Sequence, residues 1–326
     1  MADKPRIGWI GTGVMGHSMA GHLIEAGYSL TVFNRTPSKC QSLVEKGAAP
    51  AGSPREVGEK SDVVFTMVGY PADVESVTIG PNGCLDGMKA GSILCDMTTS
   101  SPTLAGKIAN RAAVSGVISL DAPVTGGDVG AMNATLSIFV GGSDEGYARI
   151  LPLLQIMGQK ILHCGRPGMG QQAKLANQIA IASVMFSVCE SLIYAQQAGL
   201  DVRKWHELVS VGAAGSVAMK TLGSRIMDGD FRPGFFIDHF VKDLGLVLEE
   251  CRRMHLVLPG ATLAEQFYRS MQARATAGKA RRPWCAPWRN SPARCGRRSS
   301  AVKTRSFTDT NHPGGHAPPR WLVLFG

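Results

Sequence analysis

A glycine-rich stretch near the start of the chain has the residue types that hold a phosphate group. Gly11, Gly13 and Gly16 have the spacing G-x-G-x-x-G within GTGVMG. In this pattern the first glycine makes a tight turn from strand to helix, the second lets the backbone approach a pyrophosphate, and the third allows close packing of helix on strand. The apolar run IGWI precedes the turn and a helical pattern follows it. This order predicts a dinucleotide-binding turn, to which Val14 and Met15 also contribute.

The end of the second expected strand, LTVFNR, indicates which dinucleotide binds. An acidic residue usually lies here and bonds the ribose 2′-hydroxyl of NAD(H), but this chain has Asn34, Arg35 and Thr36. A guanidinium can pair with a 2′-phosphate through charge-assisted hydrogen bonds, whereas a carboxylate would repel it. We therefore expect NADP(H) as the favoured cofactor, with NAD(H) as the alternative if Arg35 is only a solvated surface arginine.

A lysine in the segment GMGQQAKLANQ, at 168–178, can transfer protons. Interconversion of an alcohol and a carbonyl compound requires a positioned group that takes up or supplies the hydroxyl proton. Lys174 lies near the expected start of a long helix, where desolvation between two domains and the helix dipole both lower the pKa of an amine. Asn177 follows one helical turn later on the same face, where its amide can orient a substrate or the lysine. The alternative is a solvated helix lysine without a chemical role.

Two further segments carry groups that suit a small carboxylic acid. In PVTGG, the backbone N–H groups of Gly126 and Gly127 and the hydroxyl of Thr125 can form an anion-binding nest, although the segment can also be a tight turn after a strand. Thr99, in DMTTS, ends another expected strand. Its hydroxyl is a candidate site group, with capping of the helix before Pro102 as the alternative.

The elements that position these residues follow from the apolar pattern. From 6 to about 165, β-rich runs alternate with helical patterns, which is typical of a doubly wound parallel sheet. Ser53, followed by Pro54 and Glu56, predicts a helix that begins near 54. After GRPGMG at 165–170 the pattern is helical, with one long helix over about 171–197 and shorter ones over 201–212, 216–227, 236–254 and 261–273. We expect an α/β chain: a Rossmann-type domain over 1–165, joined by the long helix to an all-α substrate and dimerisation domain over 166–274.

The basic charge of the chain is confined to its last part. The formal net charge is +9, yet eleven of the 34 Lys and Arg residues lie in 272–326 against one acid, Asp309. Residues 1–271 are close to neutral, so we expect no nucleic-acid partner. From about 275 to 326 the sequence is rich in Pro, Gly and Arg without a helical or strand period, and we expect this atypical tail to be disordered.

Further counts limit the compartment and the cofactors. The eight cysteines are scattered without a C-x-x-C pair, which is typical of free thiols in a reducing compartment. No His or Cys spacing indicates a metal site. The apolar run 179–189 is shorter than the roughly 18 residues that cross a bilayer, so we expect no membrane partner. The first expected strand leaves no room for a leader, so we expect a cytoplasmic protein, or an organellar one if a leader has been lost.

Three motifs together resemble the β-hydroxyacid dehydrogenase family, which includes 3-hydroxyisobutyrate dehydrogenase, tartronate semialdehyde reductase and glyoxylate/succinic semialdehyde reductase. The motifs are the glycine turn continued as GVMGHSMAGHL, DAPVTGGDVGA at 121–131, and GMGQQAKLANQ at 168–178, with a later KDL at 242–244. The resemblance covers about residues 5 to 272. It implies hydride transfer between NADP(H) and a small 3-hydroxy acid, or a glycolate- or 4-hydroxybutyrate-like acid, and its aldehyde acid. It also implies a homo-oligomer, unless the tail prevents assembly.

The resemblance implies roles for individual residues. Lys174 is the general acid/base, Thr99 lies near the nicotinamide, and Lys242 approaches the cofactor from the helical domain. Asp243 and Phe235 contact the substrate. The chain departs from the usual family pattern with Thr125 in place of Ser, and with Gln178 in place of a second Asn, the latter resembling the tartronate semialdehyde reductase branch.

Two alternative functions stay open at this point. One is NAD-dependent oxidation of 3-hydroxyisobutyrate, which Arg35 argues against. The other is a catalytically silent, dehydrogenase-like protein associated with nucleic acid. Relatives of that kind lack the catalytic lysine, whereas Lys174 is present here within its full motif.

Overall fold

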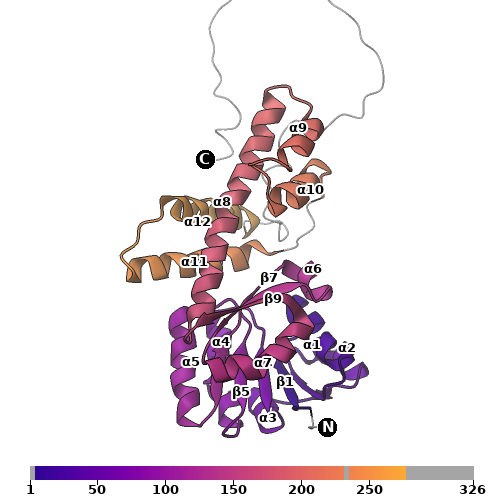
Figure 1. Ribbon diagram of the computed structural model, residues 1–326, viewed down its shortest axis with the longest axis vertical. Coiled ribbons are helices and arrows are strands. Elements are labelled where there is room, and N and C mark those ends of the chain that lie inside the picture. The colour runs from indigo at the N-terminus through magenta and orange to yellow at the C-terminus, as the bar shows by residue number, and fades with distance from the viewer. Residues whose placement is uncertain (1–3, 231–234, 277–326) are drawn as a thin grey trace, which may run out of the picture. The chain divides into compact units, whose positions relative to one another are not determined.

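The computed structural model describes residues 4–230 and 235–276 (Figure 1). These residues form two compact units, one from 4–186 with 235–276 and the other from 187–230. The expected domain boundaries at 165 and 274 stay predictions. The predicted disorder of the tail concerns residues that, from 277 to 326, lie outside the described part of the chain.

The larger unit contains a sheet of nine strands within the described residues. Their order is β3-β2-β1-β4-β5-β6-β8-β7, and β9 pairs with β8. The strands are β1 (Ile7–Ile10), β2 (Leu30–Phe33), β3 (Ala49–Pro50), β4 (Val63–Thr66), β5 (Ile93–Asp96), β6 (Ile118–Asp121), β7 (Val124–Thr125), β8 (Leu136–Gly141) and β9 (Gly158–Gly165). All neighbours from β3 to β6 are parallel, which confirms the Rossmann-type arrangement.

One edge of the sheet departs from the expected parallel arrangement. Strand β8 runs antiparallel to both β6 and β7, so the sheet is mixed. Only a short helix, α6 (Gly127–Met132), lies between β7 and β8. A parallel neighbour needs a crossover of about a dozen or more residues, whereas a shorter connection returns the chain in the opposite direction. The expectation of a wholly parallel sheet is therefore wrong at this edge.

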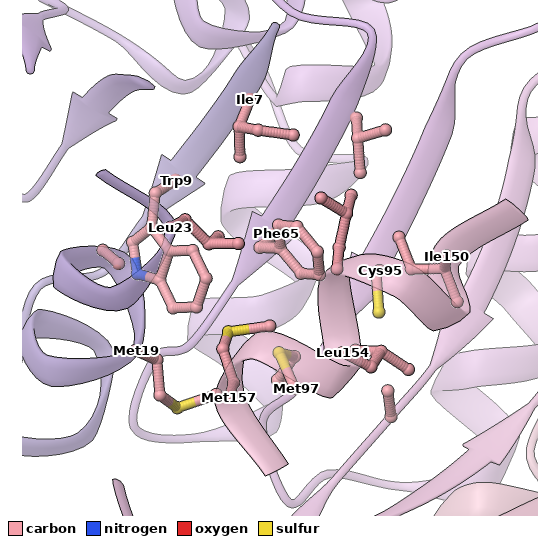
Figure 2. Packing of buried hydrophobic residues seen from close by; sticks show 14 of the residues in the cluster. Ile7, Trp9, Met19, Leu23, Phe65, Cys95, Met97, Ile150, Leu154 and Met157 are labelled. Atoms are coloured by element: carbon pink, nitrogen blue, oxygen red, sulfur yellow. The ribbon is translucent and has the colours of Figure 1, made fainter. Parts of the chain in front are cut away.

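Two hydrophobic cores cover the two faces of the sheet, because alternate strand residues point in opposite directions. Trp9 and Phe65 lie in one core with ring centroids 5.3 Å apart, while their neighbours Ile10 and Val64 lie in the other. Figure 2 shows the first core, where side chains of α1 and α7 pack near these rings. The helices around the sheet are α1 (Val14–Glu25), η1 (Pro37–Cys40), α2 (Gln41–Glu45), α3 (Pro54–Glu59), α4 (Pro71–Thr78), η2 (Cys84–Asp86), α5 (Pro102–Val114) and α7 (Asp144–Met157).

Serine caps fix the starts of two of these helices. The Ser53 hydroxyl accepts a hydrogen bond from the Glu56 N–H at 3.1 Å, which confirms the predicted helix start near 54. The Glu56 carboxylate accepts from the N–H of Gly52 at 2.7 Å. Helix α5 begins in the same way with Ser101 as its cap. The alternative reading of Thr99 as the cap of this helix is therefore wrong.

The predicted long helix is α8 (Met169–Gln197). Helices α11 (Ile237–Arg253) and α12 (Pro259–Thr276) pack on its first part through an apolar cluster that includes Ala182, Phe240 and Tyr268. The smaller unit contains the last part of α8 with α9 (Val202–Val209), the π-helical segment η3 (Ala218–Gly223) and α10 (Ser224–Met227). The single helix expected over 216–227 is thus divided into two segments.

Helix α8 is the one described helix whose length and composition would also suit a membrane span. Its mean hydropathy reaches 1.5 over a window that is 33% buried. Length and composition are weak evidence, because a core helix passes the same test. Its first turns carry buried polar side chains, among them Gln171, Lys174 and Gln178. These groups all have partners within the protein.

The first turn of α8 is hydrogen-bonded to the carboxyl ends of β5 and β6. Asp121, at the end of β6, accepts hydrogen bonds from the backbone N–H groups of Gly168 at 2.7 Å and Gln171 at 2.8 Å. A helix start leaves such N–H groups without a partner inside the helix. The Gln171 amide donates to the Thr98 carbonyl and accepts from the Ser100 N–H, both at 2.8 Å. These four bonds fix the start of α8 on this edge of the sheet.

A second buried carboxylate, Asp96, is the register partner of Asp121 on β5. Its Oδ1 accepts hydrogen bonds from the Thr66 hydroxyl at 2.7 Å and the Thr98 N–H at 3.1 Å. Burial raises the pKa of both carboxyl groups to about 6, although these hydrogen bonds oppose the shift. Both groups are thus mainly charged at neutral pH, at a cost in stability.

We expect the substitution of Asn for Asp to change the free energy of unfolding differently at positions 96 and 121. The pKa of Asp96 is higher in the folded state than in the unfolded state, so the protonated form of Asp96 favours folding. This contribution to the free energy of unfolding is complete below about pH 4 and is lost as pH rises through about 6. The loss is on the order of 3 kcal/mol. Asp96→Asn keeps an Oδ1 that can accept both bonds, so its stability should fall less than that of the wild type between pH 4 and pH 8.

Asp121→Asn is the matched variant for this comparison. Asp121 uses both carboxylate oxygens, so the new NH₂ group would face one of the two backbone N–H groups and stability should fall at every pH. Urea unfolding of the three proteins from pH 4 to pH 8 tests both statements. Parallel pH curves for the wild type and Asp96→Asn would contradict the first.

Candidate active site

The three glycines of the predicted dinucleotide turn have different surroundings. A Cβ on Gly11, whose φ is +98°, would lie 2.2 Å from the Met67 carbonyl oxygen, and one on Gly16 would lie 2.0 Å from the Gly11 carbonyl oxygen. A Cβ on Gly13 would meet nothing within 4 Å. Gly11 and Gly16 are therefore required by the packing of the protein itself, while Gly13 borders open space at the start of α1. That open space beside a helix N-terminus fits a pyrophosphate, which the N–H groups of such a terminus bind.

The residues at the end of β2 have separate functions. The Asn34 amide accepts a hydrogen bond from the Thr12 N–H at 3.1 Å and donates to the Thr36 carbonyl at 3.0 Å, so it ties the strand end to the glycine turn. The Arg35 side chain is 89% exposed and reaches the carboxylate of Asp73 at 3.4 Å. Arg35 is thus an accessible cation at the end of β2.

Lys174 lies one turn beyond the anchored start of α8, near α11, and is only 6% exposed. Its Nζ donates a hydrogen bond to Oε1 of Gln178 at 3.0 Å, and Asn177 donates to the same oxygen at 2.9 Å. The Gln178 Nε2 donates to Oδ2 of Asp243, on α11, at 2.6 Å. Asn177 therefore acts on the lysine through Gln178. Asp243, which is 1% exposed, contacts the other end of the same amide.

The surroundings of Lys174 change its acidity. Burial lowers the pKa of the Lys174 ammonium to about 8, while the charge of Asp243 raises it and the charge of Lys242 lowers it further. An amine with this pKa exists in both protonation states near neutral pH. It can therefore either accept or donate a proton in the same site.

Lys242 joins α11 to the end of β5. Its Nζ donates to the backbone carbonyl of Thr99 at 2.5 Å and pairs with Oδ1 of Asp243 at 2.9 Å. Thr99 follows Thr98, which Gln171 binds, so α8 and α11 both contact the same loop after β5. Figure 1 shows α11 crossing α8 near the sheet. Lys242, Thr99, Asp243 and Lys174 are thus brought together in one network.

The predicted carboxylate-binding turn joins the end of β7 to the start of α6. Thr125 is half-buried, and Gly126 and Gly127 are exposed with φ values of +133° and +66°. A Cβ on Gly127 would meet nothing within 4 Å. Phe235 packs on the apolar cluster of α11 and α12, with its ring centroid 5.9 Å from that of Phe240. Of the described contacts, none joins Phe235 to Lys174.

The sequence interpretation missed three residues that hold this site together. Gln178 was noted only as a departure from the usual family residue, yet it contacts Lys174, Asn177 and Asp243. Asp121 and Gln171 were given no role, although they anchor α8. The signal available for Gln178 was its position four residues after Lys174, which places the two side chains on one helix face.

Candidate metal ligands do not cluster in the part of the chain that the structure describes. Across 4–230 and 235–276, no group of three or more His, Cys, Asp or Glu side chains could hold a metal ion. The six cysteines in these ranges are free thiols.

Comparison with known proteins gives two adjacent family matches. Residues 6–165 match the NAD binding domain of 6-phosphogluconate dehydrogenase, and residues 168–282 match a domain described as NAD-binding of NADP-dependent 3-hydroxyisobutyrate dehydrogenase. A solved structure of Mycobacterium tuberculosis 3-hydroxyisobutyrate dehydrogenase with L-serine has a TM-score of 0.79 and 28% identity, covering 89% of this chain and 100% of that one.

Curated relatives agree with these matches. The chain is 56% identical over 272 residues to the probable 3-hydroxyisobutyrate dehydrogenase-like 1, mitochondrial, of Arabidopsis thaliana, covering 83% of this chain and 81% of the relative. It is 36% identical over 268 residues to the 2-hydroxy-3-oxopropionate reductase of Escherichia coli, covering 82% and 91%. The chain therefore belongs to the 3-hydroxyisobutyrate dehydrogenase, or β-hydroxyacid dehydrogenase, family of NAD(P)-dependent oxidoreductases.

Proposed function

We propose that this protein is an NADP(H)-dependent oxidoreductase that interconverts a small 3-hydroxy acid and its aldehyde acid. Lys174 is the general acid/base. The observation that carries the proposal is a buried lysine, held by Gln178 on a helix that is itself anchored to the carboxyl edge of a Rossmann-type sheet. Ligands of α/β sheets bind outside this edge. A glycolate- or 4-hydroxybutyrate-like acid belongs to the same proposal.

Lys174 supplies the proton transfer that this reaction requires. The turn at Gly13 and the start of α1 would hold a dinucleotide, which would supply the hydride acceptor for oxidation and the hydride donor for reduction. In oxidation the neutral Lys174 amine takes the proton of the substrate hydroxyl, and in reduction the Lys174 ammonium gives a proton to the carbonyl oxygen. The pKa of about 8 suits both directions, since roughly a tenth of the amine is neutral at pH 7.

The turn after β7 supports an acidic substrate. The hydroxyl of Thr125 and the N–H groups of Gly126 and Gly127 are suited to bind a carboxylate, and the space beside Gly127 is open. Two relatives point to the same chemistry. The Escherichia coli relative is named for reduction of 2-hydroxy-3-oxopropionate, and the Mycobacterium tuberculosis enzyme was solved with L-serine, which is itself a 3-hydroxy acid.

The preference for NADP(H) is inferred from Arg35. The guanidinium is exposed at the end of β2, and residues 34–36 include no acid that would repel a 2′-phosphate. NAD-dependent oxidation of 3-hydroxyisobutyrate is the second candidate, and it needs the Arg35–Asp73 pair to be only a surface contact. A cytoplasmic location and a homo-oligomeric assembly are also proposals that stand on the sequence alone.

Lys174→Ala should reduce turnover about 10²- to 10⁴-fold, because it removes the acid/base. The dissociation constant of NADPH, measured by fluorescence titration, should change little. Lys204→Ala, which removes an exposed lysine, is the control and should keep full activity. If Lys174→Ala keeps more than about a tenth of the wild-type activity, another residue transfers the proton.

Arg35→Asp should reverse the cofactor preference, because a carboxylate repels a 2′-phosphate and can accept a hydrogen bond from a ribose hydroxyl. The kcat/KM with NADPH should fall roughly 10- to 100-fold, the value of one or two charge-assisted hydrogen bonds. Arg35→Ala should lose activity with NADPH without gaining it with NADH. An unchanged NADPH to NADH ratio in both variants would show that Arg35 does not contact the cofactor.

Gly13→Ala and Gly16→Ala should separate cofactor binding from folding. The first puts a methyl group in the open space where the pyrophosphate would approach, so NADPH affinity should fall while the melting temperature stays near that of the wild type. The second forces a methyl group against the Gly11 carbonyl, so the melting temperature itself should fall. Thermal unfolding and NADPH titration of both variants check this, and normal NADPH binding by Gly13→Ala would place the phosphates elsewhere.

A further inference from the structure

The amide of Gln178 lies between a catalytic amine and a buried carboxylate. Its Oε1 accepts from Lys174 Nζ at 3.0 Å, and its Nε2 donates to Oδ2 of Asp243 at 2.6 Å. Asn177 donates to the same Oε1 at 2.9 Å, so the orientation of the amide is determined on both sides. Gln178 itself is buried. The three groups therefore form a hydrogen-bonded chain in which Lys174 donates to Gln178 and Gln178 donates to Asp243.

The carboxylate of Asp243 is not paired with Lys174. Within the described residues, its ion pair is with Lys242, at 2.9 Å, and no N–O distance to Lys174 falls within 4.0 Å. The charged groups that act on Lys174 are therefore Asp243 and Lys242, both on α11, and their effects on its pKa are opposite. Asn177 and Gln178, on its own helix, are neutral.

An amide oxygen and a carboxylate would affect the lysine differently. A direct carboxylate partner favours the ammonium form and would keep the amine protonated at neutral pH. An amide oxygen accepts one N–H of the neutral amine and leaves its lone pair free to face away from Gln178. A lysine that must accept a proton from a substrate hydroxyl needs the second arrangement.

We propose that Gln178 is a positioning residue that holds the Lys174 amine in place while it keeps the Asp243 carboxylate away from that amine. The residue at 178 thereby sets the pH range in which Lys174 can accept a proton. The proposal rests on the proposed function in taking Lys174 as the acid/base. It differs from that function in naming the group that controls the lysine.

A charge exchange tests this directly. In Gln178→Glu/Asp243→Asn, the new carboxylate at 178 can accept from Lys174, Asn177 and the new amide at 243, and the amide oxygen at 243 takes the place of Oδ1 beside Lys242. Every hydrogen bond and the net charge are kept, but the negative charge moves onto the group that contacts Lys174. The midpoint of the Lys174 titration should rise by about one pKa unit or more.

The midpoint is measured in the cofactor-free protein from the ¹³Cε chemical shift of Lys174, assigned by the signal that Lys174→Ala lacks. Asp243→Asn alone removes the charge and should lower the midpoint, which tests the proposal even if the double variant does not fold. Gln159→Glu, an exposed site on β9, adds a charge elsewhere and should leave the midpoint unchanged. An unmoved midpoint in the exchange variant, or an equal shift in Gln159→Glu, would overturn the proposal.

The pH profile of kcat in the oxidation direction gives the second readout. The alkaline shift of the exchange variant should appear there as at least about a tenfold loss of rate below the midpoint. Turnover of the wild type on 3-hydroxy acids tests the proposed function separately. If the wild type turns over no such acid but the chemical-shift midpoint moves as expected, the function fails while the arrangement of Lys174, Gln178 and Asp243 stands.

Discussion

The site depends on the attachment of one helix start to one edge of a sheet. The N-terminal N–H groups of α8 need acceptors, and the buried carboxylate of Asp121 provides two. Gly141 and Gly170 make this approach feasible, since a Cβ on Gly170 would lie 2.5 Å from the Asp121 carbonyl oxygen and one on Gly141 would lie 2.5 Å from Oδ1 of Asp121. Because Lys174 follows one turn later, its position relative to the sheet is decided by backbone hydrogen bonds rather than by its own flexible side chain.

The same edge concentrates buried charge of both signs. Asp96 and Asp121 end adjacent strands, and Lys242 binds the backbone of Thr99 while it pairs with Asp243. Buried charges are costly unless they are bonded, and here most are held by backbone N–H groups, hydroxyls or amides. Lys174 differs from the other buried charged groups. Burial lowers the pKa of its ammonium to about 8, and its direct partner in the network is a neutral amide. A group that can lose its proton is thus kept beside buried charges of both signs.

Two neutral amides connect separate parts of this network. Gln171 connects the loop after β5 to α8, and Gln178 connects Lys174 to Asp243. Each uses both ends of its amide, so each fixes two neighbours at once. An amide does this with little effect on the protonation of its neighbours, whereas a carboxylate would shift their pKa values. Gln178 therefore holds Lys174 without placing a charge next to it, although in the sequence Gln178 is only a departure from the usual family residue.

The sequence by itself determined the glycine turn, the order of strands and helices, the long helix and the candidate lysine. Each of these rests on neighbouring residues or on a periodic pattern, as with Gly11 to Gly16 and Ser53 to Glu56. The reversed strand β8, the anchoring by Asp121, and the link from Gln178 to Asp243 were decided only by the tertiary structure. Their partners are distant in sequence, 47 positions from Asp121 to Gly168, 65 from Gln178 to Asp243 and 143 from Lys242 to Thr99. No local pattern encodes which buried donor meets which acceptor across such separations, because that choice follows from how the sheet and helices pack.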